Sequence, residues 1–427
     1  MTEADARARE LVQTAGAFNL KGKRMLLLVP AVTYRATDFI VAANRLELDL
    51  VIGTNGALSL GGNPVVRVDP EDLSGSVRRL RSIVGAVDAV VAADTQMLPL
   101  ATSLAAKLGL PHNPVNAVTA AADKAQQRRL WAKARVPQPG FHILPAKADK
   151  RHFVEAAQAL GFPAVVKPVS LSGSRGVLRA DDETNLAAAL TEIRSILAET
   201  DRLDREPILI EEYVPGWELS IDGLLTDGSL AATAIFDKPD SPEGPTFEET
   251  LLVTPSRLPE PTLAVARNVA ERAAQTLGLR QGPIHAELRI DNRMRDLTPV
   301  MLELAARSIG GLCSRALRFP GGMSLEMMIL LNSFGHDARA LQPAGAAGVL
   351  MLPVERVGIL KEVEGREDAL AVPGITGLSI TIPLGETVRP LPWGDRYLGF
   401  IFAEGAELAQ VQDALRAARQ RLQITIA

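Results

Sequence analysis

Two stretches of the sequence each carry a glutamate within a run typical of a β-strand: Glu287 lies in residues 282–290 and Glu303 in residues 299–307. The connection at 291–299 is polar enough to be a loop, so the two runs are expected to pair as a hairpin. If the register sets Glu287 opposite Glu303, the carboxylates repel each other unless a cation lies between them. Mg²⁺ is the natural candidate, because it takes one or two carboxylates together with phosphate oxygens. The alternative is another register in which both glutamates pair with nearby arginines.

The strand period extends this prediction to neighbouring side chains, because successive residues of a strand point to opposite sides of a sheet. One side of the first run then holds His285, Glu287 and Arg289, and one side of the second holds Met301, Glu303, Ala305 and Arg307. The second run leads into residues 307–311, Arg-Ser-Ile-Gly-Gly, which offer a guanidinium and a glycine turn beside the expected metal. Such a pair suits a carboxylate or a phosphate.

A second group of residues lies in the stretch Val165–Val177. A β-run there delivers Lys167, and the loop Ser170–Gly176 consists largely of small residues whose backbone amides an anion can approach closely. This is the outline of a phosphate cradle, although it matches neither the P-loop motif nor the simple dinucleotide fingerprint. The alternative is a surface hairpin in which Gly173 and Gly176 only permit turns and Lys167 is solvated.

A third group stands at the end of another buried-looking run, Ile208–Tyr213. Glu211 and Glu212 are adjacent there, and two acids are costly to desolvate without partners, so a positive or hydrogen-bonding group is expected beside them. The base and ribose of a nucleotide would serve. The alternative is a strand end that reaches solvent, where glutamates are common.

Composition narrows the class of protein. The chain has 427 residues, 47% of them hydrophobic and 22% charged, which is the usage of a globular protein of two or three domains. The net charge of -4 leaves no cationic excess for a nucleic-acid partner. No apolar run approaches the roughly 18 residues of a membrane span. The single cysteine, Cys313, excludes an intramolecular disulfide, predicts an intracellular protein, and is expected to be packed inside.

The order of elements predicts an α/β fold with several modules. Residues 23–114 alternate β-rich and helical runs, which implies a parallel sheet covered by helices. Two prolines at 137 and 139 stop the helix that follows, and a new domain is expected to begin there. Residues 238–250, rich in Pro and Glu, predict a mobile loop crossing the site. β-rich runs follow residue 344 and end in an amphipathic helix at 408–422, while the first ten residues predict a short exposed helix.

These motifs, in this order and spacing, resemble the ATP-grasp superfamily of carboxylate–amine ligases. Within it they resemble the L-amino-acid (dipeptide) ligases, whose strand pair ends in an Ala-Arg-x-Gly-Gly-like signature, here Leu304–Gly311. The resemblance covers essentially the whole chain and implies an ATP-grasp fold. Its parts would be a Rossmann-like domain at 1–115, an ATP-grasp module at 116–335 with a small ATP-binding subdomain at about 140–215, and a β-rich C-terminal domain at 336–427.

The resemblance implies an ATP site and assigns residues to it. The residues implied for the nucleotide are Lys124, Lys167, Ser172, Gly173, Ser174, Gly176, Glu211, Glu212, Val214 and Glu218. The two lysines would contact the phosphates, and the loop at 170–176 would be a flexible flap over the β- and γ-phosphates. The other four residues would hold adenine and ribose, two of them through their backbone.

The resemblance assigns the metal and the substrates in the same way. Mg²⁺, or Mn²⁺ in its place, would be held by Glu287 and Glu303, and Arg307 would act in catalysis with Lys167. The substrate site would consist of His285, Arg307, Gly310 and Gly311. One departure concerns the metal: many ATP-grasp enzymes have Asn two residues after the second glutamate, where this chain has Ala305. The metal then has one ligand fewer or finds a replacement.

The implied activity is an ATP-dependent ligation that activates a small carboxylate, such as an amino acid, as an acyl phosphate and couples it to an amine, releasing ADP and phosphate. Two alternatives stay open: a biotin-carboxylase-like or purine-pathway enzyme, and a non-catalytic ATP-binding protein. Ala305 and the stretch 304–311 fit the dipeptide branch better. The expected partners are small carboxylates and amines, with neither nucleic acid nor a membrane, and the expected state is a cytoplasmic homodimer. The sequence does not name the two substrates.

Overall fold

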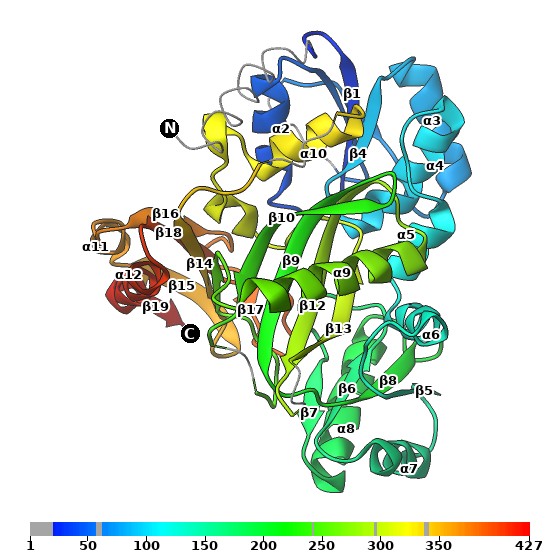
Figure 1. Cartoon of the computed structure of the whole chain (residues 1–427), viewed down its shortest axis with the longest axis vertical. Helices are drawn as coiled ribbons and strands as arrows, with labels where there is room; N and C mark the ends of the chain where they lie inside the picture. Colours follow the sequence, from blue (N-terminus) through cyan, green and yellow to red (C-terminus); the bar gives the residue numbers. More distant parts are fainter. Residues whose placement is uncertain (1–19, 57–61, 241–242, 294–296, 337–340) are drawn as a thin grey trace.

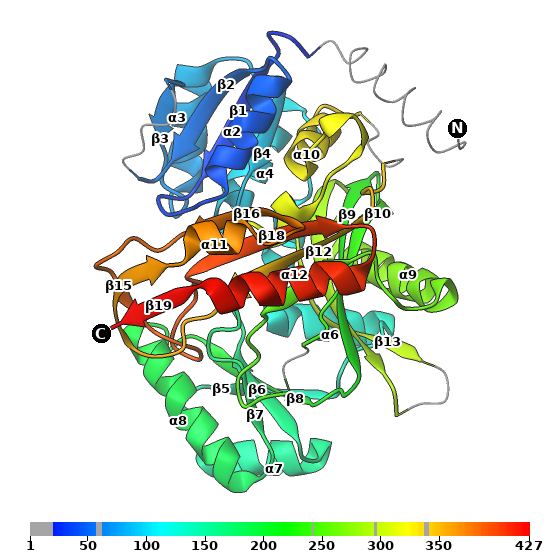
Figure 2. The same cartoon turned by 90° about the vertical axis from the view of Figure 1, so that its left-hand side faces the viewer.

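The computed structural model describes residues 20–56, 62–240, 243–293, 297–336 and 341–427. In this described part the strands form four sheets, and the mixed α/β fold class that the sequence predicted is confirmed (Figures 1 and 2). The helix expected for the first ten residues lies outside the described residues.

The N-terminal part is a parallel sheet, as the βα alternation predicted. Its strand order is β3-β2-β1-β4, with every pair parallel. The strands are β1 (Arg24–Val29), β2 (Asp49–Thr54), β3 (Val65–Arg67) and β4 (Ala89–Ala92). The accompanying helices are α2 (Ala36–Arg45), α3 (Leu73–Val84), η1 (Thr95–Met97) and α4 (Leu98–Leu108). Because both faces of the sheet are covered, β1 is apolar and buried from its second residue to its last.

A short helical segment leads into a small antiparallel sheet of order β5-β8-β6-β7. Helix α6 begins at Lys124 because the Asp123 carboxylate accepts hydrogen bonds from two free amides of the first turn. The helices of this segment are α5 (Val115–Ala121), α6 (Lys124–Ala134), α7 (Lys150–Leu160) and α8 (Glu183–Glu199). The strands are β5 (Phe141–Pro145), β6 (Ala164–Pro168), β7 (Leu178–Ala180) and β8 (Pro207–Glu212).

The largest sheet is antiparallel and has eight strands in the order β13-β12-β9-β10-β11-β14-β18-β16. Its first five strands along the chain are β9 (Trp217–Thr226), β10 (Ser229–Asp237), β11 (Leu251–Thr254), β12 (Gly282–Asp291) and β13 (Thr298–Ala305). Helix α9 (Glu260–Leu277) covers one face of this part (Figure 1). The hairpin expected from residues 282–307 is confirmed as the β12–β13 pair.

The C-terminal part does not stand apart from this large sheet, because β14 (Ala346–Leu352), β16 (Ile375–Ile380) and β18 (Gly399–Gly405) continue it. A three-stranded sheet lies beside them, formed by β15 (Gly358–Glu364), β17 (Thr387–Val388) and β19 (Gln423–Ile426). The remaining helices are η2 (Cys313–Ala316), η3 (Pro320–Gly322), α10 (Leu325–Ser333), α11 (Arg366–Leu370) and α12 (Leu408–Arg421). Helix α10 packs against α2 of the N-terminal part (Figure 2). One apolar core therefore contains residues of the N-terminal part, of α10 and of the large sheet. In the described ranges, no helix has both the length and the apolar character that crossing a membrane requires.

Candidate active site

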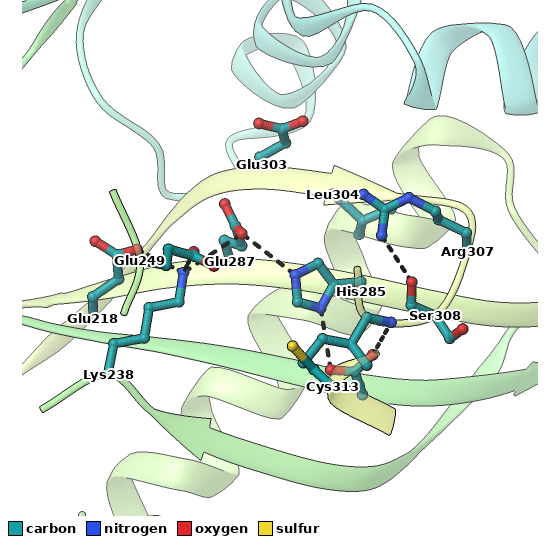
Figure 3. Close-up of polar contacts among 12 residues, drawn as sticks. Glu218, Lys238, Glu249, His285, Glu287, Glu303, Leu304, Arg307, Ser308 and Cys313 are labelled. Atoms are coloured by element: carbon teal, nitrogen blue, oxygen red, sulfur yellow. Dashed lines mark hydrogen bonds and ion pairs between the residues drawn. The ribbon is translucent and has the colours of Figure 1, made fainter. Parts of the chain in front are cut away.

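The predicted register of the carboxylate pair is confirmed. Glu287 of β12 pairs with Glu303 of β13, and His285 pairs with Ala305. The side chains of Glu287 and Glu303 are 25% and 33% exposed, so both are within reach of a ligand from solvent (Figure 3). Two accessible carboxylates on neighbouring strands are the donors that Mg²⁺ accepts when phosphates supply further oxygens.

The predicted face is wrong for Met301. The register shifts after Glu287, so that Leu288 pairs with Met301 and Leu302 is the extra residue of a β-bulge. The bulge reverses the alternation, and Met301 is fully buried in the same hydrophobic cluster as Leu288. Glu303 keeps its predicted place because it lies on the other side of the bulge.

Nearby cations keep Glu287 ionised. Lys238 Nζ lies 3.5 Å and His285 Nε2 3.3 Å from Glu287 Oε1. Burial acts to raise the pKa of Glu287, but Lys238, His285 and Arg307 outweigh burial and hold that pKa well below its ordinary value. The carboxylate is therefore charged at neutral pH and suited to a cation.

His285 lies between two carboxylates. Its Nδ1 is 3.1 Å from Asp222 Oδ2, while its Nε2 faces Glu287. Burial acts to lower the pKa of His285, but Asp222 and Glu287 raise it to about 9, so the ring is a cation at neutral pH. Asp222 was not singled out in the sequence; its signal is an acid in the middle of the largely apolar strand β9, where it is 1% exposed.

Lys238 is a second residue that sequence reasoning missed, because residues 238–250 read as a loop. Its buried ammonium lies 2.7 Å from Glu218 Oε1 and also binds Glu249 (Figure 3). The other oxygen of Glu218 accepts a hydrogen bond of 2.8 Å from Arg289 Nε. Both oxygens of Glu218 are thus engaged by cations, and the ribose contact expected for this residue requires one of them to give way. The available signal was a lysine placed directly after a buried strand.

The two lysines expected at the phosphates converge on this site from different elements. Lys124 Nζ, at the start of α6, lies 3.1 Å from Glu303 Oε1 and donates a hydrogen bond of 2.7 Å to the Leu171 carbonyl of the predicted flap. Lys167 Nζ, in β6, lies 2.6 Å from Glu211 Oε2. Lys124 therefore connects the flap to the carboxylate pair.

Glu211 has the positive partners that a desolvated acid was expected to need. Its carboxylate is buried between Lys167 and Arg128, whose Nε donates to Oε1. Burial acts to raise the pKa of Glu211, but Arg128 and Lys167 lower it below its ordinary value. These contacts suit a residue that positions Lys167, and the nucleotide-binding role assigned to Glu211 stays a prediction. Arg128 is fully buried and was also missed, since nothing local marks it among the other arginines of α6.

Replacing Glu211 with glutamine is expected to lower the free energy of unfolding by about 3–5 kcal/mol, because two buried cations lose their shared counter-charge. Urea unfolding of the purified variant measures this. Glu155→Gln is the matched control: Glu155 pairs with Arg151 on the exposed face of α7, and little change is expected there. A Glu211→Gln variant as stable as the wild type would show that Glu211 is not the counter-charge that stabilises the two buried cations.

Some of the backbone groups expected to bind adenine form hydrogen bonds within the protein. The Glu212 amide donates to the Gly140 carbonyl at 2.9 Å, and its side chain lies 2.7 Å from Arg293 Nη1. The Val214 carbonyl accepts from Arg289 Nη1 at 2.9 Å. The nucleotide-binding role of this stretch stays a prediction.

The predicted flap, which includes Ser172 and Ser174, is a tight loop that contacts the C-terminal part of the chain. Gly173, Ser174 and Gly176 have positive φ angles of 64°, 56° and 72°. The Gly176 amide donates to the Pro392 carbonyl at 3.0 Å, and a Cβ added at Gly173 would lie 3.3 Å from the Asp395 carbonyl oxygen. Residues 390–395 therefore cover the loop, and the close approach explains the small residues there.

The glycine turn predicted after β13 is present beside Arg307. Arg307 Nη1 donates to the Ser308 carbonyl at 2.8 Å, and a Cβ at Gly310 would lie 3.7 Å from the same nitrogen. Gly311 has φ of 60°, and a Cβ there would collide with Phe400 at 2.6 Å. The turn thus requires glycine at position 311, and it runs between the Arg307 guanidinium and the Phe400 ring.

Cys313 is buried as predicted, with 1% of its surface exposed. Burial, with the charges of Glu249 and Asp222, raises the pKa of its thiol. We expect no alkylation of the native protein by iodoacetamide at mildly alkaline pH, and full alkylation in urea, because only the thiolate is reactive. Mass spectrometry of the intact protein measures both. Rapid labelling of the native protein would show that the thiol is accessible and ionised.

The donor chemistry fits a divalent cation that takes most of its ligands from elsewhere. Among the residues that the structure describes, no cluster of three or more His, Cys, Asp and Glu side chains could hold a metal by itself. Ala305, at the position of the missing third ligand, pairs with His285 and supplies no donor. Glu287 and Glu303 suit Mg²⁺ with phosphate oxygens and water completing the shell.

Comparisons with known proteins identify two domains in this chain. Residues 160–316 match the ATP-grasp domain, and residues 350–427 match the L-amino acid ligase C-terminal domain 2. The chain is 24% identical to the uncharacterized protein y4rH of Sinorhizobium fredii over 94% of this chain and 82% of that protein. It is 29% identical to alanine–anticapsin ligase of Bacillus subtilis over 54% of this chain, and the match spans about half of that ligase, 51%. The crystal structure of an L-amino acid ligase from Bacillus licheniformis superposes with a TM-score of 0.80 and 24% identity, covering 95% of this chain and all of that one.

The chain therefore contains an ATP-grasp domain, at residues 160–316. Its C-terminal residues, 350–427, form the L-amino acid ligase C-terminal domain 2. The recognition made from the sequence motifs is confirmed at both levels. The residues expected to bind ATP, metal and substrates stay predictions, and so do the two substrates.

Proposed function

We propose that the protein is an ADP-forming ligase that activates a small carboxylate, in the simplest case an amino acid, as an acyl phosphate and couples it to an amine. The observation that supports this most is the register of β12 and β13, in which Glu287 faces Glu303. Lys124 contacts Glu303 and the flap at once, so phosphates bound there would meet metal ligands and lysines together. Phosphoryl transfer depends on this kind of positioning and charge compensation.

Activation is needed because a free carboxylate does not condense with an amine in water. A carboxylate oxygen attacks the γ-phosphorus of ATP, the new oxygen–phosphorus bond forms, and the bond to the bridging oxygen of ADP breaks. The amine nitrogen then attacks the acyl carbon, loses a proton, and phosphate leaves with the oxygen that made the attack. ADP and phosphate are therefore released once for each amide bond formed.

The side chains of the site have separate parts in this scheme. Lys124 and Lys167 bind the phosphates, and Glu211 with Arg128 holds Lys167 in place. Mg²⁺ bound by Glu287 and Glu303 would offset negative charge on the transferring group. Arg307, together with the amides of the glycine turn at 310–311, faces the acyl group and stabilises the oxyanion of the tetrahedral intermediate. The flap and residues 390–395 exclude water, which would hydrolyse the acyl phosphate.

The C-terminal domain favours this reaction over the two alternatives. A biotin-carboxylase-like or purine-pathway enzyme shares the ATP-grasp module, but the matched C-terminal domain is that of L-amino acid ligases. A non-catalytic ATP-binding protein has no need to keep two facing carboxylates and the cations around them. Both alternatives nevertheless make distinct predictions, which one assay can separate.

The test is release of ADP and phosphate by the purified protein with Mg²⁺-ATP and a panel of amino acids and other small carboxylates. Each compound is supplied singly and in pairs, with and without bicarbonate. We expect ADP release that depends on a particular pair, with a product whose mass is the sum of the two less one water. ADP release that requires bicarbonate would support the carboxylase-like alternative. ATP binding without turnover across the panel would favour the non-catalytic one.

A further inference from the structure

Arg35 is a buried arginine that none of the site assignments includes. It lies in the loop after β1, directly before helix α2, and is 6% exposed. Its Nη2 donates a hydrogen bond to the Ser308 hydroxyl, across a sequence separation of 273 residues. Its Nη1 is buried and has no hydrogen-bond partner among the described residues. A buried donor without a partner is costly, which marks it as a group kept for a ligand.

The guanidinium of Arg307 contacts the same residue, Ser308. Arg307 Nη1 donates to the Ser308 carbonyl at 2.8 Å, so both arginines contact one serine, through its hydroxyl and its backbone (Figure 3 shows the Arg307 contact). Within the described ranges, neither guanidinium has a carboxylate within the 4.0 Å of an ion pair. Two cations of like charge repel each other in a buried site, and an anion between them would relieve the repulsion.

The acids near Arg35 do not neutralise the positive charge of Arg35 and Arg307. Burial and the neighbouring charge of Arg307 lower the pKa of Arg35, and Asp94, Glu326 and Asp222 oppose them from beyond ion-pair distance. Asp222 is already engaged, because its carboxylate contacts His285 and accepts from the Ile309 amide at 2.7 Å. These three acids therefore weaken the positive potential at Arg35 but form no ion pair with it.

Aromatic rings from distant parts of the chain border this site. Phe400 of β18 contacts Tyr34, the neighbour of Arg35, and Tyr397, each at a ring-centroid distance of 6.1 Å. Gly311, at the end of the turn that begins with Arg307, packs on the same Phe400 ring. An apolar border lowers the local dielectric and strengthens a charge-assisted hydrogen bond.

We propose that Arg35 and Arg307 together form a carboxylate subsite, in which Arg35 is a binding residue supplied by the N-terminal part of the chain. This inference rests on the proposed ligase function and names a substrate feature: a carboxylate group held by two planar guanidinium forks, which match its geometry. The carboxylate has two sources, the acid to be activated or the α-carboxylate of an amino acid that serves as the amine. The ATP phosphates have Lys124 and Lys167, so they do not need this pair.

The position of the subsite relative to the metal pair is set by a continuous set of contacts. Ser308 is 1% exposed, and the next amide, of Ile309, is bound by Asp222. Asp222 contacts His285, and His285 contacts Glu287. A carboxylate bound at Arg35 and Arg307 is thereby held at a fixed distance from the reacting phosphoryl group, which is the condition for productive orientation.

The first test separates a binding role from a structural one, and it needs no activity. Arg35→Met removes a buried charge that has no carboxylate within ion-pair distance among the described residues, so we expect an unfolding temperature equal to or above that of the wild type. Arg128→Met is the matched control, because Arg128 is equally buried but paired with Glu211, and its loss is expected to lower the unfolding temperature. A comparable decrease in both variants would assign Arg35 to the framework and overturn the proposal.

The second test measures anion binding, again without turnover. Succinate and glycine are expected to raise the unfolding temperature of the wild type and not of Arg35→Met, whereas glycinamide, which has no carboxylate, raises neither. Equal shifts in both proteins would overturn the proposal. These outcomes hold whether or not a ligase activity is found, so failure of the subsite and failure of the proposed function are distinguishable.

The third test uses the substrate pair that the ADP-release panel identifies. Arg35→Met is expected to raise the KM of one carboxylate substrate about 10- to 100-fold and to leave the KM of ATP unchanged, with partial recovery in Arg35→Lys. Replacing the amine substrate by its carboxamide identifies the source. If the wild type then falls to the level of the variant, the α-carboxylate of the amine is bound there; if the variant remains lower, the activated acid is. An unchanged KM for both substrates would overturn the proposal.

Discussion

Replacing Lys167 with methionine is expected to lower kcat/KM for ATP turnover by roughly 10²–10³-fold, the effect of removing one preorganised charge from a transition state. Lys167 Nζ is buried 2.6 Å from Glu211, and Arg128 binds the other oxygen of the same carboxylate. Burial, together with the charges of Arg128 and Lys124, lowers the pKa of Lys167, although Glu211 opposes them. Positive charges outnumber negative charges around Lys167, and a bound phosphate would balance this excess.

The fold is expected to survive this substitution, because Arg128 and Glu211 remain as a one-to-one pair. Thermal unfolding checks this, and steady-state ADP release measures the activity. Lys361→Met is the matched control: it makes the same change at an exposed position of β15, and full activity is expected. A folded Lys167→Met variant with near wild-type turnover would remove Lys167 from the nucleotide site.

Replacing Glu303 or Glu287 with glutamine is expected to lower ATP turnover by at least about 100-fold, since a direct metal ligand should cost no less than the 10–100-fold of an outer-shell partner. An amide oxygen is a weaker ligand than a carboxylate for a hard cation, and it carries no charge. The Mg²⁺ concentration that gives half-maximal turnover is expected to rise in both variants. Titration of ADP release with Mg²⁺ measures both effects.

Glu364→Gln, an exposed position on β15, is the control for the loss of one negative charge. Circular dichroism shows whether each variant keeps its secondary structure. If both Glu287→Gln and Glu303→Gln kept the Mg²⁺ dependence of the wild type, the facing carboxylates would not be the metal site.

Local sequence patterns predicted the strands of the site well, because alternation and β-branched runs are local signals. Lys167 lies in β6, within the stretch where the sequence predicted a β-run. The hairpin with Glu287 opposite Glu303 followed from two β-runs and a polar connection. The face predicted for Met301 was wrong. A β-bulge inserts one residue without a local sequence signal, so strict alternation cannot anticipate it.

The charge network could not be predicted in the same way, since its members are far apart in the sequence. Lys238 contacts Glu218 and Glu287 across separations of 20 and 49 residues, and Arg35 contacts Ser308 across 273. Which cation neutralises which carboxylate depends on how the sheets are placed in space. For this reason the sequence could not name Arg128 and Lys167 as the cations paired with Glu211, whose nucleotide-binding role stays a prediction.

The most direct measurement follows one oxygen atom from the carboxylate substrate into the released phosphate. With the substrate pair identified, the acid is supplied with ¹⁸O in both carboxylate oxygens, and the phosphate and nucleotide products are analysed by mass spectrometry. If the carboxylate attacks the γ-phosphorus, each phosphate released carries one ¹⁸O and the ADP carries none. Unlabelled phosphate, or ¹⁸O in AMP released with pyrophosphate, would contradict an acyl phosphate and with it the proposed reaction.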